Sequence, residues 1–252
     1  MQHFYVWHWK HWKRWFVVLT LALVTATTLW FQYNGTLSVF STDKPSAFSK
    51  GNKKSNNIAI TFNISWGEKK IHDILKVLKK HQVQATFFVS GEWAERHPDI
   101  LEDITDDKHE LGMLGYRYKS YLDQDIDAVR KDLTYAKEIF DKIGYEKMPL
   151  LRTPHGHFNK DIIKLATDMD FQVIHWSLNT HDWKNPGTDM LIDKVMSETS
   201  KGDIILFHAS DAAKQTAKAL ETILPGLKNQ QYEPVTMSEM MDQAHANSSI
   251  VD

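Results

Sequence analysis

The 252-residue sequence contains no cysteine. This absence excludes disulfide bonds, metal sites built from thiolates and a cysteine nucleophile. The sequence also lacks an excess of charge of either sign, since its formal net charge is -2 and its isoelectric point is about 6.7. Proteins that bind nucleic acid usually carry a strongly basic surface. We therefore expect no nucleic-acid partner.

An uncharged apolar run lies near the amino end, at residues 15–33. A helix needs about 20 apolar residues to cross the hydrocarbon core of a membrane. Basic residues precede this run and aromatic residues flank it, which is typical of a transmembrane helix whose amino end faces the cytoplasm. The basic and aromatic residues concerned are Lys10, Lys13, Arg14, Trp12, Trp15, Trp30 and Tyr33.

Two other interpretations of the run remain open, a cleaved signal peptide and a buried core helix. A signal peptide usually has a shorter apolar stretch followed by a small-residue A-x-A site, and no such site stands out here. The pattern favours an uncleaved signal anchor at 15–33 that follows a cytoplasmic basic and aromatic segment at 1–14. We expect a single-pass membrane protein whose domain lies on the outer face, in the cell wall or spore envelope.

Residues 34–57 are rich in Ser, Asn, Gly and Lys and show no sustained hydrophobic period. Such a composition predicts a flexible linker that lets a domain stand off the membrane. The sequence then predicts one domain at 58–244 and a short tail at 245–252.

Strand and helix patterns alternate throughout this domain. Such alternation indicates a parallel sheet with right-handed crossovers. The units are few for an eight-unit barrel, so we expect an α/β fold of the distorted or incomplete (β/α) barrel type, with functional groups at the carboxyl ends of the strands. The expected strands are 58–64, 85–90, 110–114, 149–152, 171–178, 203–208 and 233–235. The expected helices are 68–81, 92–106 with a break at His97-Pro98, 124–143, one that begins at the N-cap Asn159, 188–198 and 211–228.

Polar, aromatic and charged residues gather at these strand ends, in the segments TFNISWG, ELGMLGYRY, LRTPHGHFN, NTHDW and ILFH. The segments fall in the order and at about the spacing of the five motifs of carbohydrate esterase family 4, the NodB-homology polysaccharide deacetylases. With its SWG, ERHPD and DWKNPG segments, the chain is most similar to the membrane-anchored sporulation branch called PdaB-type. The resemblance covers about residues 58–239 and implies a barrel of the NodB-homology type.

In that family, an aspartate and two histidines hold a divalent metal such as zinc, and the metal activates the water that attacks an N-acetylated sugar. A second aspartate takes the proton. The resemblance places the base at Asn63, the metal aspartate at Ile64 and the metal histidines at Leu114 and Tyr118. Isoleucine and leucine have no lone pair to offer, and a neutral phenol is a poor ligand. We therefore expect no metal cofactor.

The same substitutions predict a loss of hydrolysis. Without a metal ion, water keeps a pKa near 15.7 instead of about 7. Asn63 cannot take a proton, and the loss of a general base alone costs about 10²- to 10⁴-fold in rate.

Other motif positions are retained. By resemblance, Arg152 matches the arginine that orients the base, Asp182 belongs to the fourth motif, and His208 matches the acid that protonates the leaving amine. These side chains can hydrogen-bond a sugar, or they can form a residual ion pair that only steadies the mouth of the barrel. Aromatic and imidazole rings offer stacking faces for a sugar. The residues expected to contact the glycan are Tyr116, Pro154, His155 and Trp183.

Three functions remain open. The favoured hypothesis is a catalytically inactive member of the family that is tethered to the membrane and faces peptidoglycan or another N-acetylated glycan. The second is an active N-deacetylase that uses a relocated metal or none. The third is a structural membrane protein that docks a partner protein not identified by the sequence. The histidines that could rebuild a metal site are His109, His155, His157, His175, His181 and His208.

Overall fold

The computed structural model describes residues 16, 18–20, 22–23, 25 and 46–248. The chain divides into two compact units, Met1–Lys44 and Pro45–Asp252. Most of the expected anchor at 15–33, the segment at 1–14 and the first part of the linker lie outside the described residues. Within the described residues, no helix is both long enough and apolar enough to cross a membrane.

A parallel sheet forms the centre of the second unit. Its middle strand is β1, Asn57–Ile64, and all eight of its residues are buried. Hydrogen bonds join β1 to three strands, β2 (Thr86–Val89), β7 (Ile204–His208) and β8 (Glu233–Val235). The strand order is β5-β4-β3-β2-β1-β7-β6 with β8 beside β1, so the parallel α/β architecture is confirmed. The remaining strands are β3 (Glu110–Met113), β4 (Leu150–Leu151), β5 (Gln172–Val173) and β6 (Leu178–Asn179).

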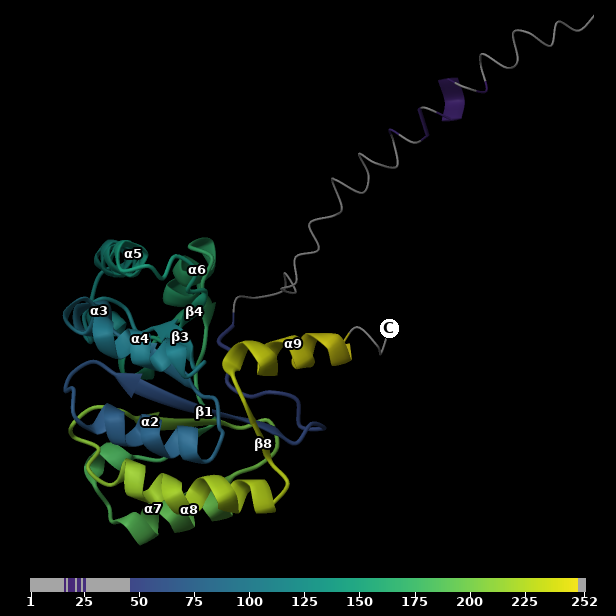
Figure 1. The fold of residues 1–252 in the computed structure, drawn as a ribbon. Helices are drawn as coiled ribbons and strands as arrows, with labels where there is room; N and C mark the ends of the chain where they lie inside the picture. The colour runs from purple at the N-terminus through teal and green to yellow at the C-terminus, as the bar shows by residue number, and fades with distance from the viewer. Residues whose placement is uncertain (1–15, 17, 21, 24, 26–45, 249–252) are drawn as a thin grey trace, which may run out of the picture. The chain divides into compact units, whose positions relative to one another are not determined.

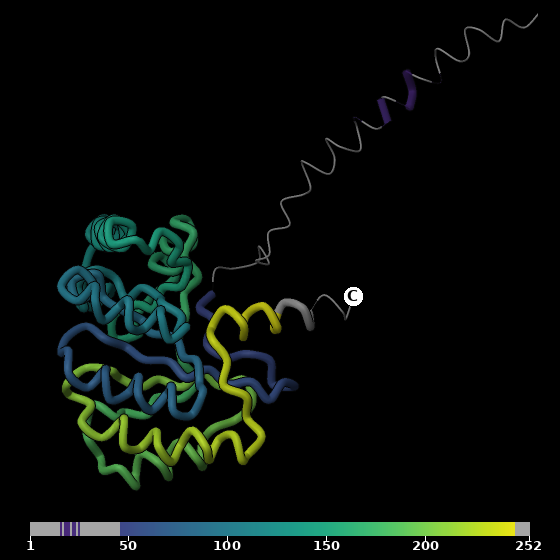
Figure 2. The backbone as a smooth tube through the Cα atoms, viewed as in Figure 1, coloured from purple at the N-terminus to yellow at the C-terminus, as the bar shows by residue number. Residues whose placement is uncertain are grey.

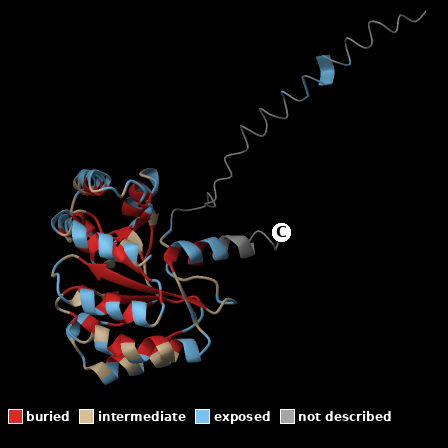
Figure 3. Ribbon diagram, in the orientation of Figure 1, coloured by how far each residue is buried: buried red, intermediate tan, exposed pale blue. Residues whose placement is uncertain are grey.

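Helices pack around this sheet in two groups. Figure 1 shows α2, α7 and α8 on one side of β1 and α3 to α6 on the other. Buried residues fill the sheet and the inner helix faces, and the outer helix faces are exposed (Figure 3). The helices are α2 (Lys70–Lys80), α3 (Gly91–Arg96), α4 (Pro98–Asp106), α5 (Ile126–Lys142), α6 (Lys160–Asp168), α7 (Thr188–Glu198), α8 (Thr216–Asn229) and α9 (Met237–Ser248). Short 3-10 turns are η1 (Tyr121–Asp123), η2 (Pro154–Gly156) and η3 (Asp182–Lys184).

Local sequence signals account for several of these elements. The apolar face of α2, which includes Ile71, Ile74 and Leu78, is buried. Pro98 begins α4 and separates it from α3, because a proline disfavours helix in the residue before it. The Asn159 side chain caps α6 by accepting a hydrogen bond from the N–H of Ile162 at 2.9 Å.

Two predicted elements are wrong in extent. The strand expected at 171–178 is split into β5 and β6, which lie at opposite ends of the strand order. The helix expected at 211–228 begins only at Thr216. Asp211 lies outside it because its carboxylate accepts hydrogen bonds from the backbone N–H groups of Lys69 and Lys70, both at 2.9 Å, at the start of α2.

The segment before β1 also differs from the expected linker, because residues 48–51 pair with the domain. The N–H of Phe48 donates to the carbonyl of Val173 at 2.8 Å, and the N–H of Gly51 donates to the carbonyl of Gly202 at 2.7 Å. Lys50 forms an ion pair with Asp203 at 2.7 Å. These contacts join residues 48–51 of the expected linker to the sheet domain.

The last helix, α9, was not predicted. It follows β8 and lies beside the segment that leads into β1 (Figure 2). A capping box starts it, since the N–H of Thr236 donates to the Glu239 carboxylate at 2.8 Å and the N–H of Glu239 donates to the Thr236 hydroxyl at 3.3 Å. Met237 and Met240 are buried on its inner side. The T-x-x-E pattern was the signal that could have revealed this helix.

Candidate functional site

The carboxyl ends of the central strands bring Asn63 and His208 together. These two residues are paired in the register of β1 and β7. The N–H of Ala209 then donates to the carbonyl of Asn63 at 2.9 Å. We call this end of the sheet the mouth and define it by Asn63, Tyr118, Arg152, Asp182 and His208.

Arg152 is fully buried behind the mouth. Its Nη1 donates to the Asn63 amide oxygen at 3.0 Å and to the Thr61 hydroxyl at 3.1 Å. Its Nη2 donates to the His175 carbonyl at 3.3 Å and its Nε to the Ile174 carbonyl at 3.4 Å. Every one of these acceptors is neutral. Burial accordingly lowers the pKa of Arg152 to about 9.

Two aromatic rings cover the guanidinium. The Cζ of Arg152 lies 3.9 Å from the ring centroid of Phe88 and 5.6 Å from that of Trp176. The Trp176 ring is in turn stacked on His175 at 4.0 Å. Sequence reasoning missed Phe88 and Trp176, because one lies in a strand interior and the other in a segment expected to be strand. Cation–π contacts of this kind help to hold a guanidinium whose hydrogen-bond acceptors in the described part of the chain are all neutral.

Asp182 and His208 form a second polar cluster. The Asp182 side chain is fully buried and its Oδ1 lies 2.8 Å from the His208 Nδ1. Oδ1 also accepts the N–H of Trp183 at 3.0 Å. Oδ2 accepts the N–H of His208 at 2.8 Å and the Thr216 hydroxyl at 2.7 Å. Because an ionised carboxylate can only accept a hydrogen bond, the Nδ1 of His208 must donate to it. A neutral His208 ring therefore carries its proton on Nδ1, and this bond fixes the orientation of the ring.

Tyr118 is half-buried at the mouth. Its ring centroid is 4.3 Å from that of His155. Burial raises the pKa of Tyr118, and hydrogen bonding from the His155 backbone, hydrogen bonding from the Asn63 side chain and the charge of Arg152 oppose that shift. The phenol is therefore neutral near pH 7.

The positions that the resemblance assigns to metal ligands do not fit a metal ion. Ile64 and Leu114 are both 0% exposed. Ile64 belongs to the main hydrophobic core, and Leu114 to a second apolar cluster that includes Phe88 and Ile174. With apolar side chains at two ligand positions and a neutral phenol at the third, this donor set does not suit a divalent cation.

The histidines considered for a relocated metal site are dispersed. In the described part of the chain, no group of three or more His, Asp or Glu side chains is arranged to hold a metal ion. His155 and His157 are neighbours, with ring centroids 5.8 Å apart. His109 precedes β3, so it lies at the opposite end of the sheet from the mouth. Its ring is tilted against that of Phe87 there, with the two ring centroids 5.3 Å apart.

The residues expected to contact a glycan occupy different places. Trp183 is 47% exposed beside the mouth, and His155 is exposed next to Tyr118. Pro154 is buried in η2. Tyr116 points away from the mouth, because its ring packs edge-on against Tyr135 of α5 at 4.4 Å. Sequence reasoning also missed Trp66, which is 53% exposed just after β1.

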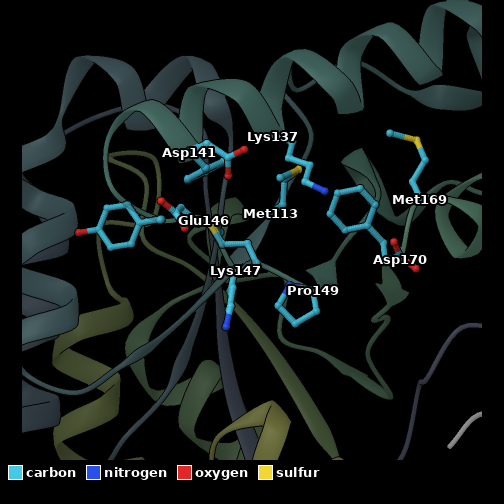
Figure 4. Close-up of a pocket in the computed structure, with 12 residues that line it drawn as sticks. Met113, Lys137, Asp141, Glu146, Lys147, Pro149, Met169 and Asp170 are labelled. Carbon is cyan, nitrogen blue, oxygen red and sulfur yellow. The ribbon is translucent and has the colours of Figure 1, made fainter. Parts of the chain in front are cut away.

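A cavity of about 290 Å³ lies elsewhere in the domain, and Figure 4 shows its lining. Its residues include Glu146, Lys147 and Pro149, which precede β4, and Asp170, which precedes β5. Because the strands are parallel, residues that precede a strand lie at the end of the sheet opposite the mouth. This cavity is therefore separate from the candidate site.

Comparisons with known proteins agree with the fold and the motifs. The family model for polysaccharide deacetylase matches residues 50–174. The uncharacterized protein YlxY of Bacillus subtilis is 29% identical over 200 residues, which cover 79% of this chain and 62% of YlxY. A peptidoglycan-N-acetylglucosamine deacetylase of Bacillus cereus is 32% identical over 192 residues, which cover 75% of this chain and 89% of that protein.

A crystal structure of BA3943, described as a CE4 family pseudoenzyme from Bacillus anthracis, superposes with a TM-score of 0.74. The two proteins are 29% identical, and the match covers 79% of this chain and 69% of that one. A BA3943 mutant described as having restored enzymatic activity superposes with the same TM-score. With the parallel sheet, the ordered motifs and these relatives in agreement, the chain belongs to the polysaccharide deacetylase family.

Proposed function

We propose that this protein binds N-acetylated cell-wall glycan, such as peptidoglycan, without hydrolysing it. The complete burial of Ile64 and Leu114 in apolar clusters carries this proposal. Restoring a metal site requires replacing core side chains, and Asn63 at the base position cannot take a proton. The BA3943 pseudoenzyme supports the idea that a member of this family can keep its fold without its activity.

The groups that remain at the mouth suit binding. Asp182 orients His208, and Trp183 offers an exposed ring. A hydroxyl group of a sugar can form a hydrogen bond with His208, and the apolar face of the sugar ring can stack on Trp183. The relatives named as peptidoglycan deacetylases support an N-acetylated glycan as the ligand.

Calorimetric titration with chitotetraose, together with an assay for released acetate, tests this function. We expect saturable binding and no acetate. Trp183→Ala should weaken binding about tenfold, because stacking on an exposed ring contributes about 1 kcal/mol or more. Tyr135→Ala removes an exposed aromatic ring from α5 and should leave binding unchanged. Acetate release by the unmodified protein would contradict the proposal, and an absence of binding would favour a protein-docking role.

We also propose that residues 15–33 anchor the domain at the outer face of the membrane, in the cell wall or spore envelope. The uncharged run and the basic residues before it support this topology. Because the chain has no cysteine, single cysteines report it cleanly. In intact protoplasts, a membrane-impermeant maleimide should label Lys218→Cys on the exposed side of α8 and should not label Gln2→Cys. The reverse labelling would overturn the orientation.

A further inference from the structure

The strand β5 lies at one end of the strand order and pairs with β4 on one side. The backbone N–H groups of Gln172 and Ile174 donate toward β4, each at 2.8 Å. The backbone groups that alternate with these point the other way, because successive groups of a strand face opposite neighbours. A segment that precedes β1 in the chain covers this second side. We call residues 46–51 the edge segment.

Phe48 supplies the backbone partners in the edge segment. Its N–H donates to the carbonyl of Val173 at 2.8 Å, and its carbonyl accepts the N–H of His175 at 2.9 Å. Phe48 thereby forms a parallel bridge with Ile174. At the other end of the edge segment, Lys50 forms an antiparallel bridge with Asp203, just before β7. The edge segment therefore joins β5 to β7, two strands that are not neighbours in the strand order.

The stretch that Phe48 holds is also the stretch that holds Arg152. The carbonyls of Ile174 and His175 accept hydrogen bonds from the guanidinium at 3.4 and 3.3 Å. The Trp176 ring centroid lies 5.6 Å from the Arg152 Cζ. A displacement of residues 174–176 would therefore move three groups that contact the buried guanidinium.

The Phe48 side chain supports the same group of residues. Its ring is half-buried and packs against the apolar cluster that contains Phe88 and Ile174. The Phe88 ring centroid in turn lies 3.9 Å from the Arg152 Cζ. Burial of apolar surface favours the docked edge segment. Phe48 thus supports the surroundings of Arg152 through its backbone and through its ring.

We propose that Phe48 is a positioning residue for the candidate site. The edge segment holds residues 173–176, these residues hold Arg152, and Arg152 orients the Asn63 amide at the mouth by its 3.0 Å hydrogen bond. The edge segment follows the expected membrane anchor in the sequence. Detaching it from the sheet should loosen the mouth. By linkage, a ligand that requires an ordered mouth should stabilise the docked edge segment.

Modification of the full-length protein with phenylglyoxal, an arginine-specific reagent, tests this role, with each site located by mass spectrometry. In the unmodified protein, buried Arg152 should react far more slowly than Arg130, which is exposed on α5. Phe48→Ala should raise the Arg152 rate about tenfold relative to Arg130, because truncating a half-buried ring favours local opening. Phe48→Leu keeps the backbone bonds and most of the apolar contact, so it should stay close to the unmodified protein.

Lys50→Ala is the matched control within the edge segment. It removes the 2.7 Å ion pair with Asp203 and retains Phe48, so it should leave the Arg152 rate unchanged. Urea denaturation of both variants gives the loss of global stability for comparison. An equal acceleration in Lys50→Ala would show general loosening of the domain and would overturn the positioning role. An unchanged Arg152 rate in Phe48→Ala would overturn it as well.

Calorimetric titration with chitotetraose separates this inference from the proposed glycan binding. We expect Phe48→Ala to weaken binding about fivefold, a coupling of the size usual between linked sites, and Lys50→Ala to leave it unchanged. A raised Arg152 rate with unchanged affinity would overturn the link to the mouth. If the unmodified protein does not bind the glycan, the proposed function fails, and the arginine rates alone decide the role of Phe48.

Discussion

Arg152 Nη1 donates to the amide oxygen of Asn63 at 3.0 Å, so a fully buried cation is held by a neutral side chain. The resemblance to the deacetylase family implies an aspartate at this position. Losing that carboxylate removes both a proton acceptor and the counter-ion of the arginine. The same substitution therefore links the predicted loss of hydrolysis to a changed electrostatic character of the mouth.

Restoring the four changed positions should create a metal site. The variant carries Asn63→Asp, Ile64→Asp, Leu114→His and Tyr118→His. We expect it to retain about one zinc ion after dialysis and the unmodified protein to retain none, measured by elemental analysis. Buried charge without metal should destabilise the variant by about 3 kcal/mol or more, and zinc at 100 times its dissociation constant should recover about 2.7 kcal/mol.

The double variant Asn63→Asp and Tyr118→His keeps both apolar side chains and should bind no zinc. Zinc retention by the unmodified protein at an equal level would contradict the assignment of the ligand positions.

Asp182→Asn should destabilise the domain. An amide nitrogen cannot accept, so two of the four hydrogen bonds at this buried side chain are lost, and we expect a decrease of about 2–3 kcal/mol in the free energy of unfolding. Urea denaturation measures it. Thr216→Val removes only the 2.7 Å hydroxyl bond and should cost about 1 kcal/mol. Equal costs in the two variants would show that loss of an Asp182 oxygen costs no more than loss of the single Thr216 bond, and would contradict the prediction.

His109 should make stability depend on pH in the acid range. Its Nδ1 accepts the N–H of Ala85 at 3.2 Å, and burial lowers its pKa from 6.5 to about 4. Above pH 6.5 the His109 ring is neutral in the folded and in the unfolded state, so its contribution to the free energy of unfolding is fully present there. Between pH 6.5 and 4 the unfolded chain binds the proton first, and stability falls by at most about 3 kcal/mol.

The measurement is the free energy of unfolding against pH for the unmodified protein and for His109→Asn. Carboxylates titrate in both proteins and cancel in the comparison. The difference between the two curves should change over pH 6.5 to 4 and stay constant above that range. Parallel curves throughout would show that His109 is not the group responsible.

Lys50 should stabilise the domain from outside its expected boundary. Its ion pair with Asp203 is 2.7 Å long, and the Asp203 side chain is only 5% exposed. Lys50→Ala leaves a buried carboxylate with only the Ser177 hydroxyl and the Ser200 N–H, so we expect a loss of about 1–3 kcal/mol in urea denaturation. Lys53→Ala changes an exposed lysine and should have no effect. A similar loss in both variants would assign the effect to net charge.

The sequence by itself determined the chemical identity of the site positions and the regular elements. No arrangement of the chain can give Ile64 or Leu114 a metal-binding lone pair, so the mismatch with a metal site follows from residue type. The alternating pattern predicted the parallel sheet, and the caps and breaks at Asn159 and Pro98 were predicted because those signals act over a few residues.

Only the tertiary structure decided which of these groups meet. The segment expected to be one strand at 171–178 is divided between two edges of the sheet, and residues 48–51 pair with it from outside the expected domain. The structure turns Tyr116 toward α5 and leaves Arg152 with neutral acceptors. These outcomes depend on contacts between residues far apart in the chain, whose strength is set by burial and by the full set of neighbours rather than by any local pattern.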